Sequence, residues 1–178
     1  MATLVLTVIG DDQTGLVDAL AGTIAEHRGN WERSHMAQLA GKFAGIVLAT
    51  VPDANVQALI GALKPLETKG LLDITVEEAD ESTRVVDDPA ATASFGIELV
   101  GQDRLGIIHD LAGALAEIGV SIDELTSRTT EAPMAGGLLF EAEATVSGPI
   151  GLAITDLEDA VAALGRDVQL AVRPILQS

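Results

Sequence analysis

The sequence contains an internal repeat, and this feature limits the folds open to the chain more than any other. A shift of 91 positions aligns residues 6–26 with residues 97–117, and eight pairs are then identical. The identical pairs are Gly10/Gly101, Asp12/Asp103, Gly15/Gly106, Leu20/Leu111, Ala21/Ala112, Gly22/Gly113, Ala25/Ala116 and Glu26/Glu117. Because both copies keep the spacing Gly-x-Asp-x-x-Gly, we interpret the chain as a duplicated domain.

A charged, turn-rich segment separates the two copies. Residues 77–84 are mostly charged, and residues 87–92 read Asp-Asp-Pro-Ala-Ala-Thr. Self-repelling segments that contain proline are typical of linkers. We therefore predict a first domain at residues 1–79, an acidic linker at 80–93 and a second domain at 94–178.

Hydrophobic periodicity predicts the elements of the first copy. Residues 4–9 alternate like a strand with both faces partly covered, and residues 16–25 place apolar side chains at helical spacing. Residues 31–39 and 43–51 indicate two strands that turn at residues 40–42. The first half of the module is therefore strand, helix, strand, strand.

The same patterns complete the module. A second helix is predicted to start at Pro52-Asp53, with Asp53 as its N-cap, and to end at Pro65; a last strand then follows. The second copy repeats this order, and its second helix is predicted to stop at Gly165. The order predicts an α+β fold of two tandem ferredoxin-like βαββαβ domains, each an antiparallel sheet with two helices on one face.

Composition excludes several classes of protein. The chain has no cysteine, which excludes disulfides, thiolate zinc sites and a cysteine nucleophile. A net charge of −17 repels phosphate backbones, and 2% aromatic residues leave little surface for stacking bases. We therefore expect no direct binding of nucleic acid.

No arrangement of reactive side chains indicates catalysis or a cofactor. His27, His35 and His109 are scattered, His109 is expected to be exposed, and Ser34 and Ser127 have no nearby base. We predict no catalytic residues, no metal and no cofactor, so the protein is not expected to be an enzyme. No stretch approaches the roughly 20 apolar residues of a membrane span, and no signal peptide is visible, so we expect a cytoplasmic protein.

Two segments resemble a known family. Residues 9–17, Ile-Gly-Asp-Asp-Gln-Thr-Gly-Leu-Val, and residues 100–108, Val-Gly-Gln-Asp-Arg-Leu-Gly-Ile-Ile, each lie where a first strand meets a first helix. They resemble the glycine-bearing turn of ACT domains, the amino-acid-binding regulatory modules of metabolism. The resemblance implies a ligand site at an interface between two modules, with the turn from one and a strand from the other.

The resemblance extends over nearly the whole chain. Residues 29–43, 127–129, 132–133 and 139–140 resemble segments of tandem ACT proteins of the glycine cleavage system transcriptional repressor family. This implies a non-enzymatic regulator that senses a small amino acid, glycine or serine, and acts through a protein partner such as a transcription factor. It also implies a homodimer.

The residues of the turn explain how a free amino acid could bind there. Helix N-termini leave backbone N–H groups unpaired and carry a partial positive charge, so they accept carboxylates. Asp12 and Asp103 can accept hydrogen bonds from the ammonium group, and Asn30 can bond either end of the ligand. The candidate ligand-binding residues are Gly10, Asp11, Asp12, Gln13, Thr14, Gly15, Leu16, Asn30, Gly101, Asp103, Arg104, Leu105, Gly106, Ile107 and Ser121.

Each of these features also has a purely structural explanation. Asp12 and Asp103 could cap the helix or form an Asx-turn. Gly15 and Gly106 could serve to let the helix pack closely on the sheet, and Asn30 could be a turn residue. The alternative to an amino-acid sensor is therefore an assembly module whose sheets pair edge to edge and that binds no ligand.

Overall fold

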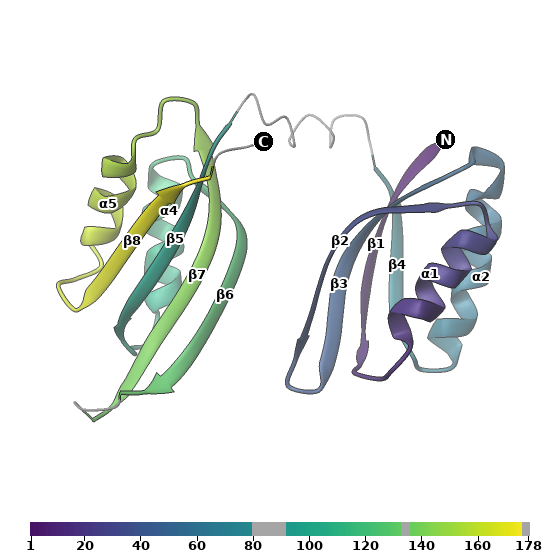
Figure 1. Ribbon diagram of the computed structural model, residues 1–178, viewed down its shortest axis with the longest axis horizontal. Helices are drawn as coiled ribbons and strands as arrows, with labels where there is room; N and C mark the ends of the chain where they lie inside the picture. Colours follow the sequence, from purple (N-terminus) through teal and green to yellow (C-terminus); the bar gives the residue numbers. More distant parts are fainter. Residues whose placement is uncertain (80–91, 133–135, 176–178) are drawn as a thin grey trace. The chain divides into compact units, whose positions relative to one another are not determined.

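The structure, a computed structural model, describes residues 1–79, 92–132 and 136–175. The chain divides into two compact units, Met1–Asp87 and Asp88–Ser178. Each unit is a four-stranded antiparallel sheet with two helices on one face, in the order βαββαβ (Figure 1). The predicted α+β fold with two tandem ferredoxin-like modules is confirmed.

The first unit covers one face of its sheet with helices. Its strands lie in the order β2-β3-β1-β4. Leu4, Leu6 and Val8 of β1 point to the helices and are at most 1% exposed, because a strand directs every second side chain to the same face. Leu20 and Leu59 complete this core from the two helices. The elements are β1 (Ala2–Asp11), α1 (Leu16–Glu26), β2 (Asn30–Leu39), β3 (Lys42–Val51), the 3₁₀ helix η1 (Asp53–Asn55), α2 (Val56–Thr68) and β4 (Asp73–Glu78).

The second unit repeats this arrangement with its own core. Its strands lie in the order β6-β7-β5-β8. Phe95, Ile97 and Leu99 of β5 alternate toward the helices and meet Leu111 and Leu157. The elements are β5 (Thr92–Gln102), α4 (Ile107–Glu117), β6 (Ser121–Glu131), β7 (Leu138–Pro149), α5 (Ile154–Ala162) and β8 (Val168–Pro174).

The predicted linker, residues 80–93, lies mostly outside the described residues, which exclude 80–91. β5 begins at Thr92, two residues before the predicted start of the second domain. The strand extends that far because β7 is long enough for Pro149 to pair with Thr92.

The predicted ends of α2 were wrong. Asp53 does not cap this helix; it lies in η1, and its Oδ2 accepts a hydrogen bond from the N-terminal ammonium group of Met1 at 3.0 Å. α2 also continues through Pro65 to Thr68. A proline removes one helical hydrogen bond, but the added turn lets Leu66 pack against the core, which favours the longer helix.

Two smaller differences concern α5 and β1. α5 ends at Ala162, before the predicted stop at Gly165, within the usual uncertainty of helix ends. The second face of β1 is more open than its alternation suggested, since Thr7 is exposed and Ile9 is 49% exposed. No described helix covers that face.

Candidate functional site

The turn between the first strand and first helix has the same backbone conformation in both units. Gly15 and Gly106 are the N-cap residues of α1 and α4, with φ of 94° and 80°. This left-handed region is readily open only to glycine. A Cβ added at either residue would have no neighbour within 4 Å. These glycines are therefore needed for the turn's conformation, and close packing of helix on sheet does not explain them.

The other pair of glycines that the two turns share, Gly10 and Gly101, has a packing role. A Cβ on Gly10 would lie 2.3 Å from the carbonyl oxygen of Leu71, and one on Gly101 would lie 3.1 Å from that of Asp167. The loop before the last strand thus passes directly over these glycines. Their place in the repeat has a structural reason, whether or not a ligand also touches them.

The turn amides are only partly used by the protein. The N–H of Asp12 donates to the carbonyl oxygen of Gly41, and the N–H of Asp103 donates to that of Leu138, both at 2.9 Å. Within the described part of the chain, the amides of residues 13–16 and 104–107 have no acceptor. They are the unpaired N–H groups expected at a helix N-terminus.

The acidic residues of the turns differ in what they bond. The carboxylates of Asp12 and Asp103 are exposed and make no hydrogen bond or ion pair with any described residue. Neither α1 nor α4 has a side-chain cap, so the explanation of these aspartates as helix caps finds no support. Asp11, in contrast, forms an ion pair with Lys42, its neighbour across the β1–β3 ladder.

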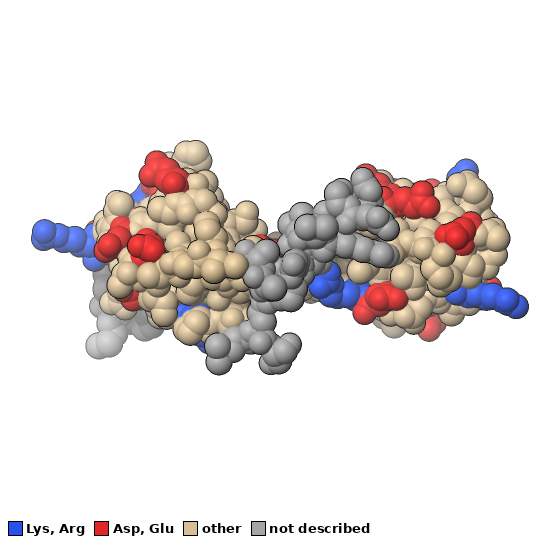
Figure 2. All heavy atoms as spheres, turned by 90° about the horizontal axis from the view of Figure 1, so that it is seen from above, with Lys and Arg blue, Asp and Glu red and all other residues tan. Residues whose placement is uncertain are grey.

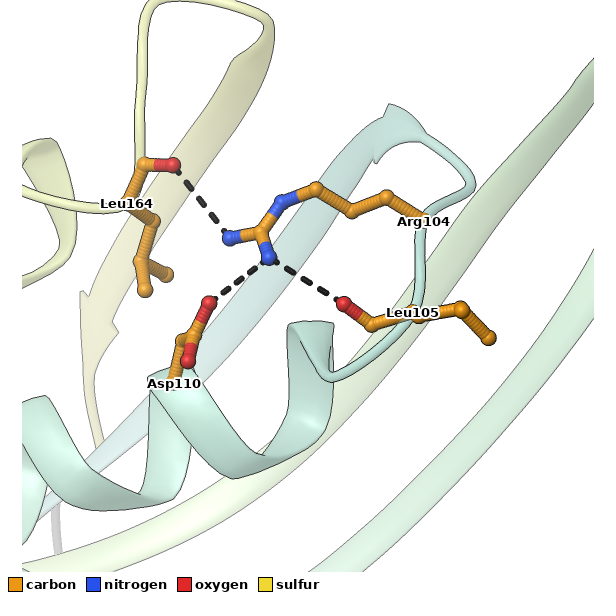
Figure 3. A network of polar contacts seen from close by, with 4 residues as sticks. All are labelled: Arg104, Leu105, Asp110 and Leu164. Atoms are coloured by element: carbon orange, nitrogen blue, oxygen red, sulfur yellow. Dashed lines mark hydrogen bonds and ion pairs between the residues drawn. The ribbon is translucent and has the colours of Figure 1, made fainter.

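Arg104 connects the second turn to α4 and to the residues that follow α5. Its Nη1 lies 2.6 Å from Oδ2 of Asp110 in the first turn of α4 and 3.5 Å from the carbonyl oxygen of Leu105 (Figure 3). Its Nη2 lies 3.4 Å from the carbonyl oxygen of Leu164, just beyond the C-terminus of α5, where a positive charge is favoured. Arg104 thus has a structural role beside its predicted ligand contact.

The side chains of the remaining turn residues point in different directions. Leu16 and Ile107 are 5% and 4% exposed and anchor their helices in the cores, so only their amides remain for a ligand. Leu105, in contrast, is 99% exposed, and Gln13 and Thr14 are exposed as well.

Asn30 lies far from the turn of its own unit. It pairs with Thr50, which pairs with Thr3 near the start of β1, whereas Gly10 lies at the other end of that strand. Seven residues of strand correspond to about 23 Å. Ser121 is displaced from its own turn in the same way. A site that uses both the turn and either residue would therefore need a second module.

The described part of the second unit has several hollows, and the sequence did not indicate the two larger ones. One hollow, of about 520 Å³, is bordered by Gly101. Among the described residues, no other predicted site residue lines these hollows. The other, of about 300 Å³, lies on the helix-free side of the sheet and includes Glu98, Glu141 and Glu143. Glu141 and Glu143 alternate with apolar residues along β7, but only the strand register places Glu98 opposite Glu143.

The described residues offer neither a metal site nor a helix that could span a membrane. Within the described ranges, no group of three or more His, Asp or Glu side chains could hold a metal ion. The described helices are all too short or too polar to cross a membrane. Figure 2 shows acidic side chains in several separate places on the face it presents. His109 is exposed, as predicted.

Comparison with known proteins gives a family match for the first unit and similarity of fold for the whole chain. Residues 2–77 match the ACT domain family. An unknown protein from Galdieria sulphuraria is 26% identical, with a TM-score of 0.83 over 98% of this chain and 99% of that one. A candidate glycine cleavage system transcriptional repressor is 17% identical, with a TM-score of 0.72 over 99% and 98%, which establishes similarity of fold. No curated protein sequence matches.

These findings define the class of the protein and then its place within that class. Each unit is a ferredoxin-like module with a glycine turn at the entry to its first helix. Residues 2–77 of the first unit match the ACT domain family, and the second unit repeats the same fold, so the chain carries two ACT-like modules in tandem.

Proposed function

We propose that this protein is a non-enzymatic regulator that binds a small amino acid at its helix-entry turns and acts through a protein partner. The observation that carries the proposal is the same in both units. A row of amides without an acceptor lies next to an aspartate, Asp12 or Asp103, whose carboxylate has no partner among the described residues. The match of residues 2–77 to the ACT domain family supports a regulatory role for such a turn.

The two ends of a free amino acid match the two parts of this turn. The ligand carboxylate would accept hydrogen bonds from the amides of residues 13–16 or 104–107, and the aspartate would accept from the ammonium group. Hydrogen bonds to charged groups contribute about 1.5–3 kcal/mol each. Asn30 or Ser121 would come from a second module, because neither reaches the turn of its own unit.

Glycine and serine are the first ligands to test, because a protein of similar fold is named for the glycine cleavage system. The partner would be a protein, for example a transcription factor, since the net charge of −17 opposes direct contact with nucleic acid. An acidic surface favours association with a basic protein surface.

Isothermal titration calorimetry of the full chain with glycine and serine tests this proposal. We expect binding that Asp12→Asn or Asp103→Asn weakens at least tenfold, since each change removes an acceptor for the ammonium group. Asp18→Asn is the matched control, because Asp18 is an exposed aspartate of the first turn of α1 and lies outside the candidate site. Equal weakening by the control would contradict a specific role for Asp12.

The second candidate function is a ligand-free assembly module, and the exposed apolar residues Ile9 and Ile46 favour association through the face of the first sheet over the edge-to-edge pairing expected from the sequence. A thermal-shift panel of the twenty amino acids separates the two functions. A ligand at 100 times its Kd stabilises by about 2.7 kcal/mol, which raises the Tm of the unit that binds it by roughly 10–20 °C, because each unit has the size of a small domain. No shift with any amino acid would favour the assembly module.

A further inference from the structure

The helix-free face of the first sheet has an apolar centre between two polar edges. Strand alternation places every second residue of each strand on this face, which we call the open face of the first sheet. Ile46 and Ile9 in its centre are 54% and 49% exposed. Its residues are Arg33, His35 and Ala37 of β2, Ala44, Ile46 and Leu48 of β3, Val5, Thr7 and Ile9 of β1, and Asp73, Thr75 and Glu77 of β4.

The strand register arranges these residues in straight rows across the sheet. The rows are Arg33–Leu48–Val5–Glu77, His35–Ile46–Thr7–Thr75 and Ala37–Ala44–Ile9–Asp73. The first row therefore runs from a positive charge, over two apolar side chains, to a negative charge. Edge strand β2 carries the basic residue and edge strand β4 carries the acidic ones.

We propose that the open face of the first sheet is an interface between two copies of this chain, packed face to face about a two-fold axis parallel to the strands. Such an axis exchanges the two edges of the sheet and keeps each row at its level. It places Arg33 over the partner's Glu77, and Leu48 over the partner's Val5. The face is thus complementary to itself, as a two-fold interface requires.

Packing the apolar centre against a second copy removes it from water, which is the main favourable term in association. Two sheets that pack face to face align their strands within about 30° and lie about 10 Å apart, which is compatible with this axis. The two Arg33–Glu77 pairs would lie at the rim and fix the orientation of the copies.

The second sheet provides an internal comparison. Its helix-free face carries Glu98, Glu141 and Glu143 on the two central strands. Glu141 forms an ion pair with Arg128, while Glu98 lies directly opposite Glu143. Face-to-face pairing there would bury several carboxylates at high cost. The proposal therefore applies to the first sheet alone.

Sedimentation velocity of the full chain over a range of concentrations tests the interface. We expect a dimer whose Kd rises at least about 100-fold in Ile46→Glu, because the dimer would then bury unpaired carboxylates. Val100→Glu is the matched control, since Val100 is 38% exposed on the helix-free face of the second sheet. This control should leave the Kd unchanged.

Charge reversal tests the orientation of the two copies. Arg33→Glu alone and Glu77→Arg alone should each weaken the dimer by roughly 10-fold, and the double variant should restore it to within a few-fold. Three strand spacings, about 14 Å, separate these residues within one sheet. Rescue must therefore come from contact between copies.

The outcomes decide the proposal as follows. A wild-type chain that stays monomeric up to ~100 μM overturns it, as does a dimer that Ile46→Glu leaves intact, which would indicate pairing through sheet edges instead. Circular dichroism checks that each variant is folded. If Ile46→Glu fails to fold, the charge reversals decide alone, and a double variant as weak as the single ones overturns the proposal.

Discussion

Single glycines control the shape of the candidate site. Gly15 and Gly106 have left-handed backbone conformations next to open space. The Cβ of an alanine would not clash with neighbouring atoms there, but the positive φ would be strained. The turn therefore owes its exposed amides to a conformational requirement that only glycine meets without strain.

Gly15→Ala should destabilise the first unit by about 1–2 kcal/mol, the cost of a left-handed conformation for a residue with a Cβ. Gly22→Ala is the matched control, because Gly22 lies inside α1 and an added Cβ there would have no neighbour within 4 Å. This substitution should stabilise the first unit by about 0.5–1 kcal/mol. Urea denaturation measures both. Changes of the same sign would contradict this explanation.

Gly10→Ala should also destabilise, for a different reason. The added Cβ would lie 2.3 Å from the backbone oxygen of Leu71, so the loop before β4 must shift, at about 1–3 kcal/mol. If thermal denaturation finds this variant as stable as the wild type, the close approach of loop and strand is wrong.

At the level of elements, the two turns are held differently. In the first unit an ion pair between Asp11 and Lys42 joins the end of β1 to the start of β3. In the second unit Arg104 joins the turn to α4 and to the end of α5. Two helix-entry turns with the same left-handed N-cap glycine therefore depend on different neighbours.

Arg104→Ala should lower the stability of the second unit by up to about 1 kcal/mol, since a half-exposed ion pair and a contact at a helix C-terminus contribute little each. Arg166→Ala, a change at an exposed arginine with no ion pair among the described residues, should have almost no effect. Thermal denaturation monitored by circular dichroism compares the two. Equal effects would remove the special role of Arg104.

At the level of the whole molecule, each unit has its own hydrophobic core. Two cores of this kind unfold as separate cooperative units when little couples them. Differential scanning calorimetry should therefore resolve two transitions, with Gly15→Ala lowering one and Gly106→Ala lowering the other. A single transition that both variants shift equally would contradict this independence.

Much of the fold was predictable because its signals are local. The duplicated Gly-x-Asp-x-x-Gly spacing, the alternation of Leu4, Leu6 and Val8 and the helical spacing of Leu16 and Leu20 each lie within a few residues. Periodicity of this range reports which face of an element is buried. Local sequence signals predicted the ends of α2 less well, because packing of Leu66 against the core decided where this helix ends.

The sequence by itself determined that two like modules would form, with their core faces and their glycine turns, because backbone geometry and hydrophobic periodicity act over short distances. Only the tertiary structure decided that Asn30 lies about 23 Å from the turn of its own unit. It alone brought Arg33 and Glu77 into one row. Strand order and register join residues far apart in the chain, and no local pattern encodes them.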